Sequence, residues 1–228
     1  MLESLHRSTV LIIGLGGVGS WIAYSLLMSG IGEVIAVDGD DVELTNLNRS
    51  AVYAPSHVGL SKVRAAAATF ADFFPDQTFT GHRQWIDSAD AVAKLATSAD
   101  FVVSAADTPH RLIRMWIREG ARVAGVPVLE TMGGAIGPIR GSSAVDYEFG
   151  VAIARDGTVQ IPTRNLNAIA RGPGVPPFHP MTDAAGVCQA IFEDLSGARS
   201  SALTRGYVRK GTLVNVGTFH EMEGPNVR

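Results

Sequence analysis

Two things are scarce in this sequence: cysteine and net charge. It has one cysteine, Cys188, among 228 residues, and its formal net charge is −3. A lone cysteine excludes an internal disulfide and a zinc site made of paired Cys-x-x-Cys units, so we predict a cytoplasmic protein without zinc. The small acidic charge gives no overall electrostatic footprint for nucleic acid and argues against such a partner.

Long hydrophobic runs are also missing. No stretch approaches the roughly 18 apolar residues that a membrane span needs. The segment Met1–Arg7 carries acids and bases, so it does not resemble a signal peptide. We therefore predict no membrane partner. Hydrophobic residues make up 46% of the chain and charged residues 18%, which is typical of a globular protein, and we predict that residues 1–228 form a single domain.

The first 140 residues alternate between strand and helix patterns. Short β-branched runs are followed by longer amphipathic or alanine-rich segments, which predicts an α/β, Rossmann-like, mostly parallel sheet flanked by helices. The predicted strands are 8–13, 33–37, 79–83, 100–104 and 127–131, and the predicted helices are 20–29, 61–74, 88–96 and 109–124. We interpret residues 1–140 as the nucleotide-binding part of the domain.

Residues 141–228 have a different pattern. Two short β patterns flank Asp156-Gly157 within 151–162, which predicts a hairpin and an antiparallel extension of the fold. Residues 162–182 are rich in Pro, Gly and Asn and predict a long crossover loop. A helix capped by Thr182 or Asp183 and ending near Leu195, then a strand over 212–219, complete the predicted substrate-side part of the chain.

A glycine-rich loop follows the first predicted strand. Gly14-Leu15-Gly16-Gly17-Val18-Gly19 satisfies G-x-G-x-x-G and opens a predicted helix, which is the context of a dinucleotide fingerprint. The glycines permit a tight turn, close approach of the backbone to phosphates and close helix–strand packing, and the helix N-terminus favours an anion. Asp38 ends the second strand, where an acid that binds a ribose is expected. This motif does not distinguish NAD, FAD and ATP.

Four residues after the fingerprint favour a triphosphate. Arg49 can bind phosphate oxygens in a fork, Asn46 can donate further hydrogen bonds, and Lys62 adds a second cation. Asp107 follows a predicted strand at the carboxyl edge of the sheet, where a carboxylate suits Mg²⁺. Individually, the two cations could be surface charges and Asp107 could cap a helix.

Taken together, these motifs resemble the ThiF/MoeB/HesA family of the ubiquitin-activating-enzyme superfamily. The similarity covers roughly residues 8–140 and rests on four matching segments: Gly14–Ser20, Asp38–Arg49, Gly59–Lys62 and Asp107. It implies an ATP-dependent adenylyltransferase, in which a carboxylate attacks the ATP α-phosphorus, pyrophosphate leaves and an acyl-adenylate remains. The implied substrate is the C-terminus of a peptide or of a small ubiquitin-like or sulfur-carrier protein, and the implied assembly is a homodimer.

The resemblance also implies roles for individual residues. Arg49 and Lys62 would bind phosphates, Asp38 the ribose and Asp107 a Mg²⁺ ion. Asn46 would organise the phosphate end of the site. The remaining nucleotide-binding positions are Gly14, Gly16, Gly17, Gly19 and Asp40. A second glycine cluster, residues 133–137, would let a substrate tail approach the adenylate.

The chain departs from the family pattern at several places. Thirteen residues precede Gly14, so the usual N-terminal arm with its arginine is missing, and Arg7 stands close to the first strand. Ser104 replaces an acid that is common three residues before Asp107, and Thr108 replaces a common asparagine. The Cys-x-x-Cys pairs are absent. These differences favour a divergent family member.

Several alternatives remain open at this level. A threonylcarbamoyl-adenosine tRNA dehydratase-like enzyme, a non-catalytic partner subunit and an NAD-dependent oxidoreductase could each use this fold, although Arg49 and Lys62 argue against the last. Cys188 is a candidate nucleophile for a thioester or persulfide. Its small apolar neighbours favour a cysteine that packs inside a helix face.

Overall fold

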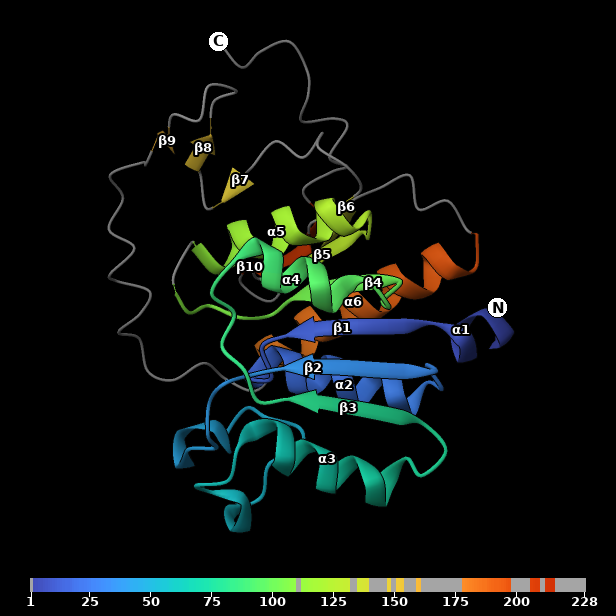
Figure 1. The fold of residues 1–228 in the computed structure, drawn as a ribbon, viewed down its shortest axis with the longest axis vertical. Helices are drawn as coiled ribbons and strands as arrows, with labels where there is room; N and C mark the ends of the chain where they lie inside the picture. Colours follow the sequence, from blue (N-terminus) through green and yellow to red (C-terminus); the bar gives the residue numbers. More distant parts are fainter. Residues whose placement is uncertain are drawn as a thin grey trace.

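The computed structural model describes the backbone of residues 2–109, 112–131, 135–139, 147–148, 151–153, 159–160, 178–197, 206–209 and 212–215, and the side chains of 3–109, 112–131 and 180–197. Its centre is a six-stranded sheet in the order β3-β2-β1-β4-β5-β6. The first five strands run parallel, and β6 (Ala135–Ile139) pairs antiparallel with β5 (Val128–Thr131) at the edge. Figure 1 shows this sheet from β3 to the β5 and β6 end.

Buried side chains alternate along the central strands. In β1 (Thr9–Ile13), Val10 and Ile12 belong to one apolar cluster, and Leu11 and Ile13 to the other. The same division continues through β2 (Glu33–Val37) and β4 (Phe101–Ser104). Both sheet faces are therefore buried, which explains why these strands are nearly continuous apolar runs.

Helices cover the two faces unequally. The cluster that contains Val10 is covered by α1 (Leu2–Arg7), α2 (Gly17–Met28), α3 (Lys62–Phe73) and α6 (Phe178–Leu195). The opposite cluster is covered by α4 (Ala89–Ala96) and α5 (Leu112–Ala124). The result is a three-layer α/β architecture.

An aromatic group lies between α2 and α3. Tyr24 meets Phe74 edge to face at 5.3 Å between ring centroids, and Phe73 at 6.3 Å. Phe73 is 61% exposed.

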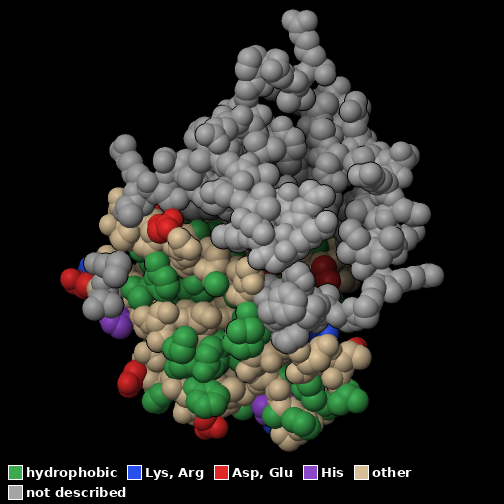
Figure 2. Space-filling model, turned by 180° about the vertical axis from the view of Figure 1, so that it is seen from behind, with side chains coloured by type: hydrophobic (Ala, Val, Ile, Leu, Met, Phe, Trp, Pro, Cys, Tyr) green, Lys and Arg blue, Asp and Glu red, His purple; other side chains and the backbone are tan. Residues whose placement is uncertain are grey.

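Figure 2 shows that hydrophobic side chains also gather on the face opposite to the view of Figure 1.

The described parts of the second half include short antiparallel strands. β7 (Tyr147–Glu148), β8 (Val151–Ile153) and β9 (Val159–Gln160) form one three-stranded sheet, and β10 (Gly206–Arg209) pairs with β11 (Thr212–Asn215). Ala152 pairs with Gln160, as the predicted hairpin requires. Among the described residues, no helix has the length and apolarity needed to cross a bilayer.

Most strand and helix predictions for residues 1–131 are confirmed to within one or two residues. The starts of α2 and α5 differ by three residues from the prediction: α2 begins at Gly17 rather than at residue 20, because the glycine loop turns directly into the helix. β3 (Thr78–His82) and α4 lie where they were predicted. α5 begins at Leu112, and the Ile113 N–H bonds to the Pro109 carbonyl at 3.0 Å, so Pro109 stands at its start.

Other predictions were incomplete. α1, β6, β7 and β10 were not expected from the sequence, and α6 begins at Phe178, four residues before Thr182. The predicted crossover loop, 162–182, lies mostly outside the described residues, as do positions 216–219 of the last predicted strand and Gly133-Gly134 of the second glycine cluster. The boundary predicted between residues 140 and 141 stays a prediction.

Candidate nucleotide-binding site

The cavity that the predicted site residues line is found where the strand order reverses. The chain moves outward from β1 to β2 and β3, then crosses back to place β4 on the other side of β1. Ligands of open α/β sheets bind outside the carboxyl ends of strands at such a switch point. A cavity of about 380 Å³ lies there. The loops after all of these strands line it, and every site residue predicted from the sequence except Gly19 is among the lining residues.

The glycine loop is packed tightly at its two ends and open in the middle. Gly14 has φ +97°, and a β-carbon there would lie 2.6 Å from the Ala105 backbone. A side chain on Gly19 would collide with the Gly14 carbonyl oxygen. Gly16 has no atom within 4 Å of the position of a β-carbon, so its backbone faces open space in the cavity. Phosphate oxygens could therefore approach the loop at Gly16.

Asp38 binds the glycine loop from the end of β2. Its Oδ2 accepts from the Leu15 N–H at 2.6 Å, and its Oδ1 accepts from the Asp40 N–H at 2.8 Å. Burial raises the pKa of Asp38 above its ordinary value, while Lys62 and the two N–H donors act in the opposite direction. Asp38 therefore holds the loop, and its remaining lone pairs are available to a ribose hydroxyl.

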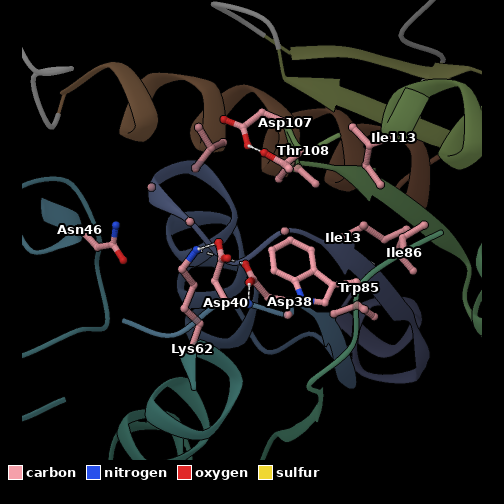
Figure 3. A pocket seen from close by; sticks show the side chains of 18 of the residues that line it. Ile13, Asp38, Asp40, Asn46, Lys62, Trp85, Ile86, Asp107, Thr108 and Ile113 are labelled. Carbon is pink, nitrogen blue, oxygen red and sulfur yellow. Dashed lines mark hydrogen bonds and ion pairs between the residues drawn. The ribbon is translucent and has the colours of Figure 1, made fainter. Parts of the chain in front are cut away.

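Lys62 begins α3 and lies deeper than a surface cation. Its Nζ is 2.6 Å from Asp40 Oδ2 and 3.7 Å from Asp38 Oδ2, and 9% of its side chain is exposed. Figure 3 shows this group on one side of the pocket, with Asp107 on the opposite side. The alternative of a solvated surface charge is thus excluded for Lys62, and its ammonium is held by two carboxylates.

Arg49 lies against the glycine loop. Its Cγ and Cδ would be 3.2 Å from a β-carbon at Gly17, so the arginine stem packs on that glycine. Its guanidinium donates to the Thr45 carbonyl and to Asn48 Oδ1. Both acceptors are neutral, and no ion pair between described residues includes Arg49, so its positive charge suits an anionic ligand in the cavity that it lines.

Asn46 and Asp107 line the cavity from two different loops. The Oδ1 of Asn46 accepts from the Glu43 N–H at 3.0 Å, which closes the short helical turn and leaves the amide NH₂ able to donate. Asp107 is exposed after β4, and one of its oxygens accepts from the Thr108 hydroxyl at 3.3 Å. A single accessible carboxylate fits Mg²⁺, which usually takes one or two protein carboxylates together with phosphate oxygens.

An apolar wall of the cavity was not predicted. Trp85 and Ile86 follow β3, and the Trp85 indole lies 2.5 Å from the position of a β-carbon at Gly39. Trp85 is 56% exposed and faces the cavity near Ile13 in Figure 3. An exposed indole beside apolar side chains suits a flat heterocycle. The sequence signal that could have revealed Trp85 is its position shortly after a strand, at the carboxyl edge of the sheet.

A second unpredicted lining residue comes from far along the chain. Pro180, in the first turn of α6, is 3.4 Å from the position of a β-carbon at Gly17. Helix α6 packs along α2, which places its start beside the glycine loop. About 160 residues separate the two positions, and no local pattern signals this contact.

Two other sequence candidates lie away from the cavity. Cys188 is 6% exposed in the core, with a hydrogen bond to Ser25, and burial raises the pKa of its thiol to about 12. The structure therefore agrees with a packed cysteine. Arg7 ends α1 at the amino end of β1, opposite the carboxyl edge that carries the cavity, and it pairs with Glu3 at 3.4 Å.

A buried carboxylate lies beside Ser104, the position at which the family commonly has an acid. Ser104 in β4 pairs in register with Glu130 in β5. Glu130 is fully buried and forms two hydrogen bonds of 2.6 Å with Arg118 of α5. A buried acid therefore stands on the neighbouring strand at the same level of the sheet, but it is not among the residues that line the cavity.

A parallel sheet with a glycine loop at its switch point defines the chain as a Rossmann-like nucleotide-binding protein. The profile of the ThiF family matches residues 1–142, so the chain belongs to the ThiF family. It is 34% identical over 134 residues to a tRNA threonylcarbamoyladenosine dehydratase of Bacillus subtilis (strain 168), covering 59% of this chain and 52% of that protein. It is 44% identical over 92 residues to ubiquitin-like modifier-activating enzyme 5 of Bombyx mori, covering 40% and 23%.

Solved structures share the fold. The E. coli MccB structure with ATP has a TM-score of 0.75 at 20% identity, and the match covers 95% of this chain and 66% of that one. The E. coli threonylcarbamoyladenosine dehydratase TcdA with AMP has a TM-score of 0.65 at 21% identity, covering 86% and 90%. The chain spans about half the length of the B. subtilis relative and less than a quarter of the B. mori one.

Proposed function

We propose that this protein is an ATP-dependent adenylyltransferase that activates the terminal carboxylate of a peptide or small carrier protein. One observation carries the proposal: the open glycine loop, Arg49, Lys62 and Asp107 line one cavity at the switch point of the sheet. Membership of the ThiF family supports it, as do the relatives of this chain, which include an adenylyltransferase and sulfurtransferase of Zea mays.

Each group has a defined role in this proposal. The loop amides at Gly16 and Gly17 and the Arg49 guanidinium bind the triphosphate, Asp38 binds the ribose and Trp85 stacks on the base. Asp107 would hold Mg²⁺, which would neutralise charge on the phosphates. The carboxylate attacks the α-phosphorus, and the bond to the β-phosphate oxygen breaks, so pyrophosphate carries away the negative charge that Arg49 and Lys62 stabilise.

The Lys62–Asp40 ion pair adds a step to nucleotide binding. The Lys62 ammonium is held by Asp40 and Asp38, so it must turn from Asp40 towards the phosphates when ATP enters. The new pair replaces a carboxylate by a phosphate of higher charge, which makes the exchange favourable. Asp40 is then free to take a hydrogen bond or a metal-bound water.

Calorimetry with Mg-ATP and with NAD tests the nucleotide assignment. We expect Mg-ATP to bind and NAD not to bind, and we expect Arg49→Ala to lose most of the affinity for Mg-ATP. Arg122→Ala is a matched control, because Arg122 pairs with Glu119 on α5 and neither residue lines the cavity. Binding of NAD instead of ATP would overturn the function but not the fold. Exchange of labelled pyrophosphate into ATP, with candidate peptides and carrier proteins added, then identifies the carboxylate.

A second function is favoured by one comparison. The B. subtilis relative is a tRNA threonylcarbamoyladenosine dehydratase, and its match covers more of this chain than the B. mori match does. An enzyme of that class would use the same ATP site to activate the carboxylate of a modified nucleoside. Incubation with ATP and with tRNA that carries threonylcarbamoyladenosine separates the two candidates, because only a dehydratase cyclises the nucleoside.

The proposal includes a homodimer and a cytoplasmic location. Family resemblance supports the dimer, and the hydrophobic side chains gathered on the face in Figure 2 offer a surface for it. The single cysteine supports a reducing compartment. Light scattering after gel filtration measures the assembly, and fractionation of cells measures the location.

A further inference from the structure

The backbone of Leu15, inside the glycine loop, is held through both of its polar groups. Its N–H donates to Asp38 Oδ2 at 2.6 Å, and its carbonyl accepts from the Tyr53 hydroxyl at 2.6 Å. Leu15 has no exposed surface, and Tyr53 is 8% exposed. Both contacts are shielded from water, so the orientation of the two peptide groups that flank Leu15 depends on both side chains.

Tyr53 also belongs to the segment that carries Arg49. This segment is joined to α2 by the Trp21 Nε1–H, which donates to the Arg49 carbonyl at 3.0 Å. Ser20 Oγ accepts from the Ser50 hydroxyl at 2.9 Å and from the Ala51 N–H at 3.3 Å. Tyr53 adds a contact from this segment to the loop itself, so Arg49 and the loop amides are held in a fixed arrangement relative to each other.

We infer that Tyr53 is a positioning residue for nucleotide binding. It fixes the glycine loop relative to Arg49, so that both can contact the same triphosphate. This inference rests on the proposed ATP site. Tyr53 does not line the cavity, so it acts through Leu15 and not by touching the nucleotide.

The Tyr53 hydroxyl is suited to donate its hydrogen bond over a wide range of pH. Burial raises the pKa of its phenol, and the charges of Asp38 and Asp40 raise it further. The hydroxyl therefore keeps its proton through the range in which the enzyme could work. Phenylalanine at this position keeps the ring and removes only the donor, which leaves the buried Leu15 carbonyl without a partner.

The test compares Tyr53→Phe with Tyr24→Phe in the whole protein. Tyr24 lies on α2 among aromatic rings, so its variant makes the same chemical change away from the loop. We expect Tyr53→Phe to weaken Mg-ATP binding about tenfold and adenosine binding much less, because the loop contacts phosphates and not the base. Tyr24→Phe should leave both affinities unchanged. Equal losses for ATP and adenosine would overturn the inference, since a general structural defect affects both.

Hydrogen exchange of the free protein provides a readout that needs no nucleotide. We expect the amides of residues 14–19 to exchange faster in Tyr53→Phe than in wild type and in Tyr24→Phe. Unchanged exchange there would overturn the inference even if ATP binds. Wild type that fails to bind Mg-ATP would defeat the proposed function, and the exchange experiment would still decide whether Tyr53 holds the loop.

Discussion

Lys62 Nζ lies 2.6 Å from Asp40 Oδ2 and 3.7 Å from Asp38 Oδ2, so a single buried cation lies between two carboxylates at the edge of the cavity. This arrangement links stability to the site. Lys62 balances the charge of both acids while the cavity is empty of phosphate, and the same ammonium is the group that a phosphate would attract.

Lys62→Met should destabilise the fold, because it leaves two neighbouring carboxylates without their cation. We expect a loss of roughly 3 kcal/mol in the free energy of unfolding at pH 8, measured by urea denaturation. Lys94→Met is the matched control, since Lys94 forms an exposed pair with Asp90 at 2.7 Å on α4 and its loss should leave the midpoint nearly unchanged.

The pH dependence of the Lys62→Met defect follows from the pKa of Asp38. Burial raises that pKa and Lys62 lowers it, so the variant has a still higher folded pKa. A carboxyl group with a raised folded pKa contributes stability at low pH that is lost as the pH rises through that pKa. The defect should therefore be smaller at pH 5 than at pH 8. An equal defect at both values would show that lost packing, and not charge, is the cause.

Gly14→Ala and Gly16→Ala should have opposite effects on folding and binding. An alanine at position 14 must adopt φ +97° and displace the Ala105 backbone, so we expect a loss of more than about 2 kcal/mol in unfolding free energy. At Gly16 the added methyl group meets no protein atom, so stability should be nearly unchanged while Mg-ATP affinity falls. Thermal unfolding and calorimetry on both variants check this pair, and similar stabilities would contradict the loop geometry.

Trp85 should report base binding. The chain has three tryptophans, and among them Trp85 lines the cavity. Saturating Mg-ATP should change tryptophan fluorescence in wild type and in Trp116→Phe, but not in Trp85→Phe. Trp85→Ala should weaken ATP and adenosine binding alike, by about tenfold, because stacking involves only the base. A loss confined to ATP would place the base elsewhere.

The buried Arg118–Glu130 pair should contribute far more to stability than the exposed Arg122–Glu119 pair, whose arginine lies on the same helix, α5. Both hydrogen bonds between these residues are 2.6 Å long, and Glu130 is completely buried. Arg118→Met leaves that carboxylate without its cation, so we expect a loss of about 3–5 kcal/mol in urea denaturation. Arg122 and Glu119 form an equivalent two-bond pair at the surface. Arg122→Met should therefore have little effect.

Cys188 should react slowly in the native protein. Burial raises the pKa of its thiol to about 12, so little thiolate exists at pH 8, and the side chain is 6% exposed. Iodoacetamide should label it rapidly only after unfolding, as mass spectrometry would measure. Because the folded pKa is raised, this thiol contributes stability at neutral pH that is lost as the pH rises above about 9, where the unfolded thiol ionises. Cys188→Ala should lack that alkaline component, and fast labelling at pH 8 would revive the nucleophile hypothesis.

Much of the fold could be predicted from local patterns. The buried strands of the parallel sheet are continuous apolar runs, and Gly14, Gly16 and Gly19 stand where a strand turns into a helix. Helix α1 could not be predicted, because six residues give too little periodicity for an amphipathic pattern. Strand β6 contains Gly137 and Pro138, which argue against a strand, and its place at the antiparallel edge accommodates them.

Some residues of the candidate site could be predicted and others could not, for physical reasons that differ between them. Gly14, Asp38 and Asp107 stand at strand ends, and the carboxyl ends of parallel strands meet at one edge of a sheet. Trp85 also follows a strand, but its weak strand pattern hid it. Pro180 and Tyr53 could not be predicted, because their roles depend on contacts across 163 and 38 positions of the chain.

The sequence by itself predicted that a glycine loop, an acid after the second strand and two cations belong to one site, because these motifs and their spacing are local properties. The tertiary structure alone decided how these groups are held. It buried Lys62 between two carboxylates, packed Arg49 on Gly17 with neutral acceptors for its guanidinium, and joined Tyr53 to Leu15. Burial and charge pairing arise between segments distant in the chain, so no local pattern records them.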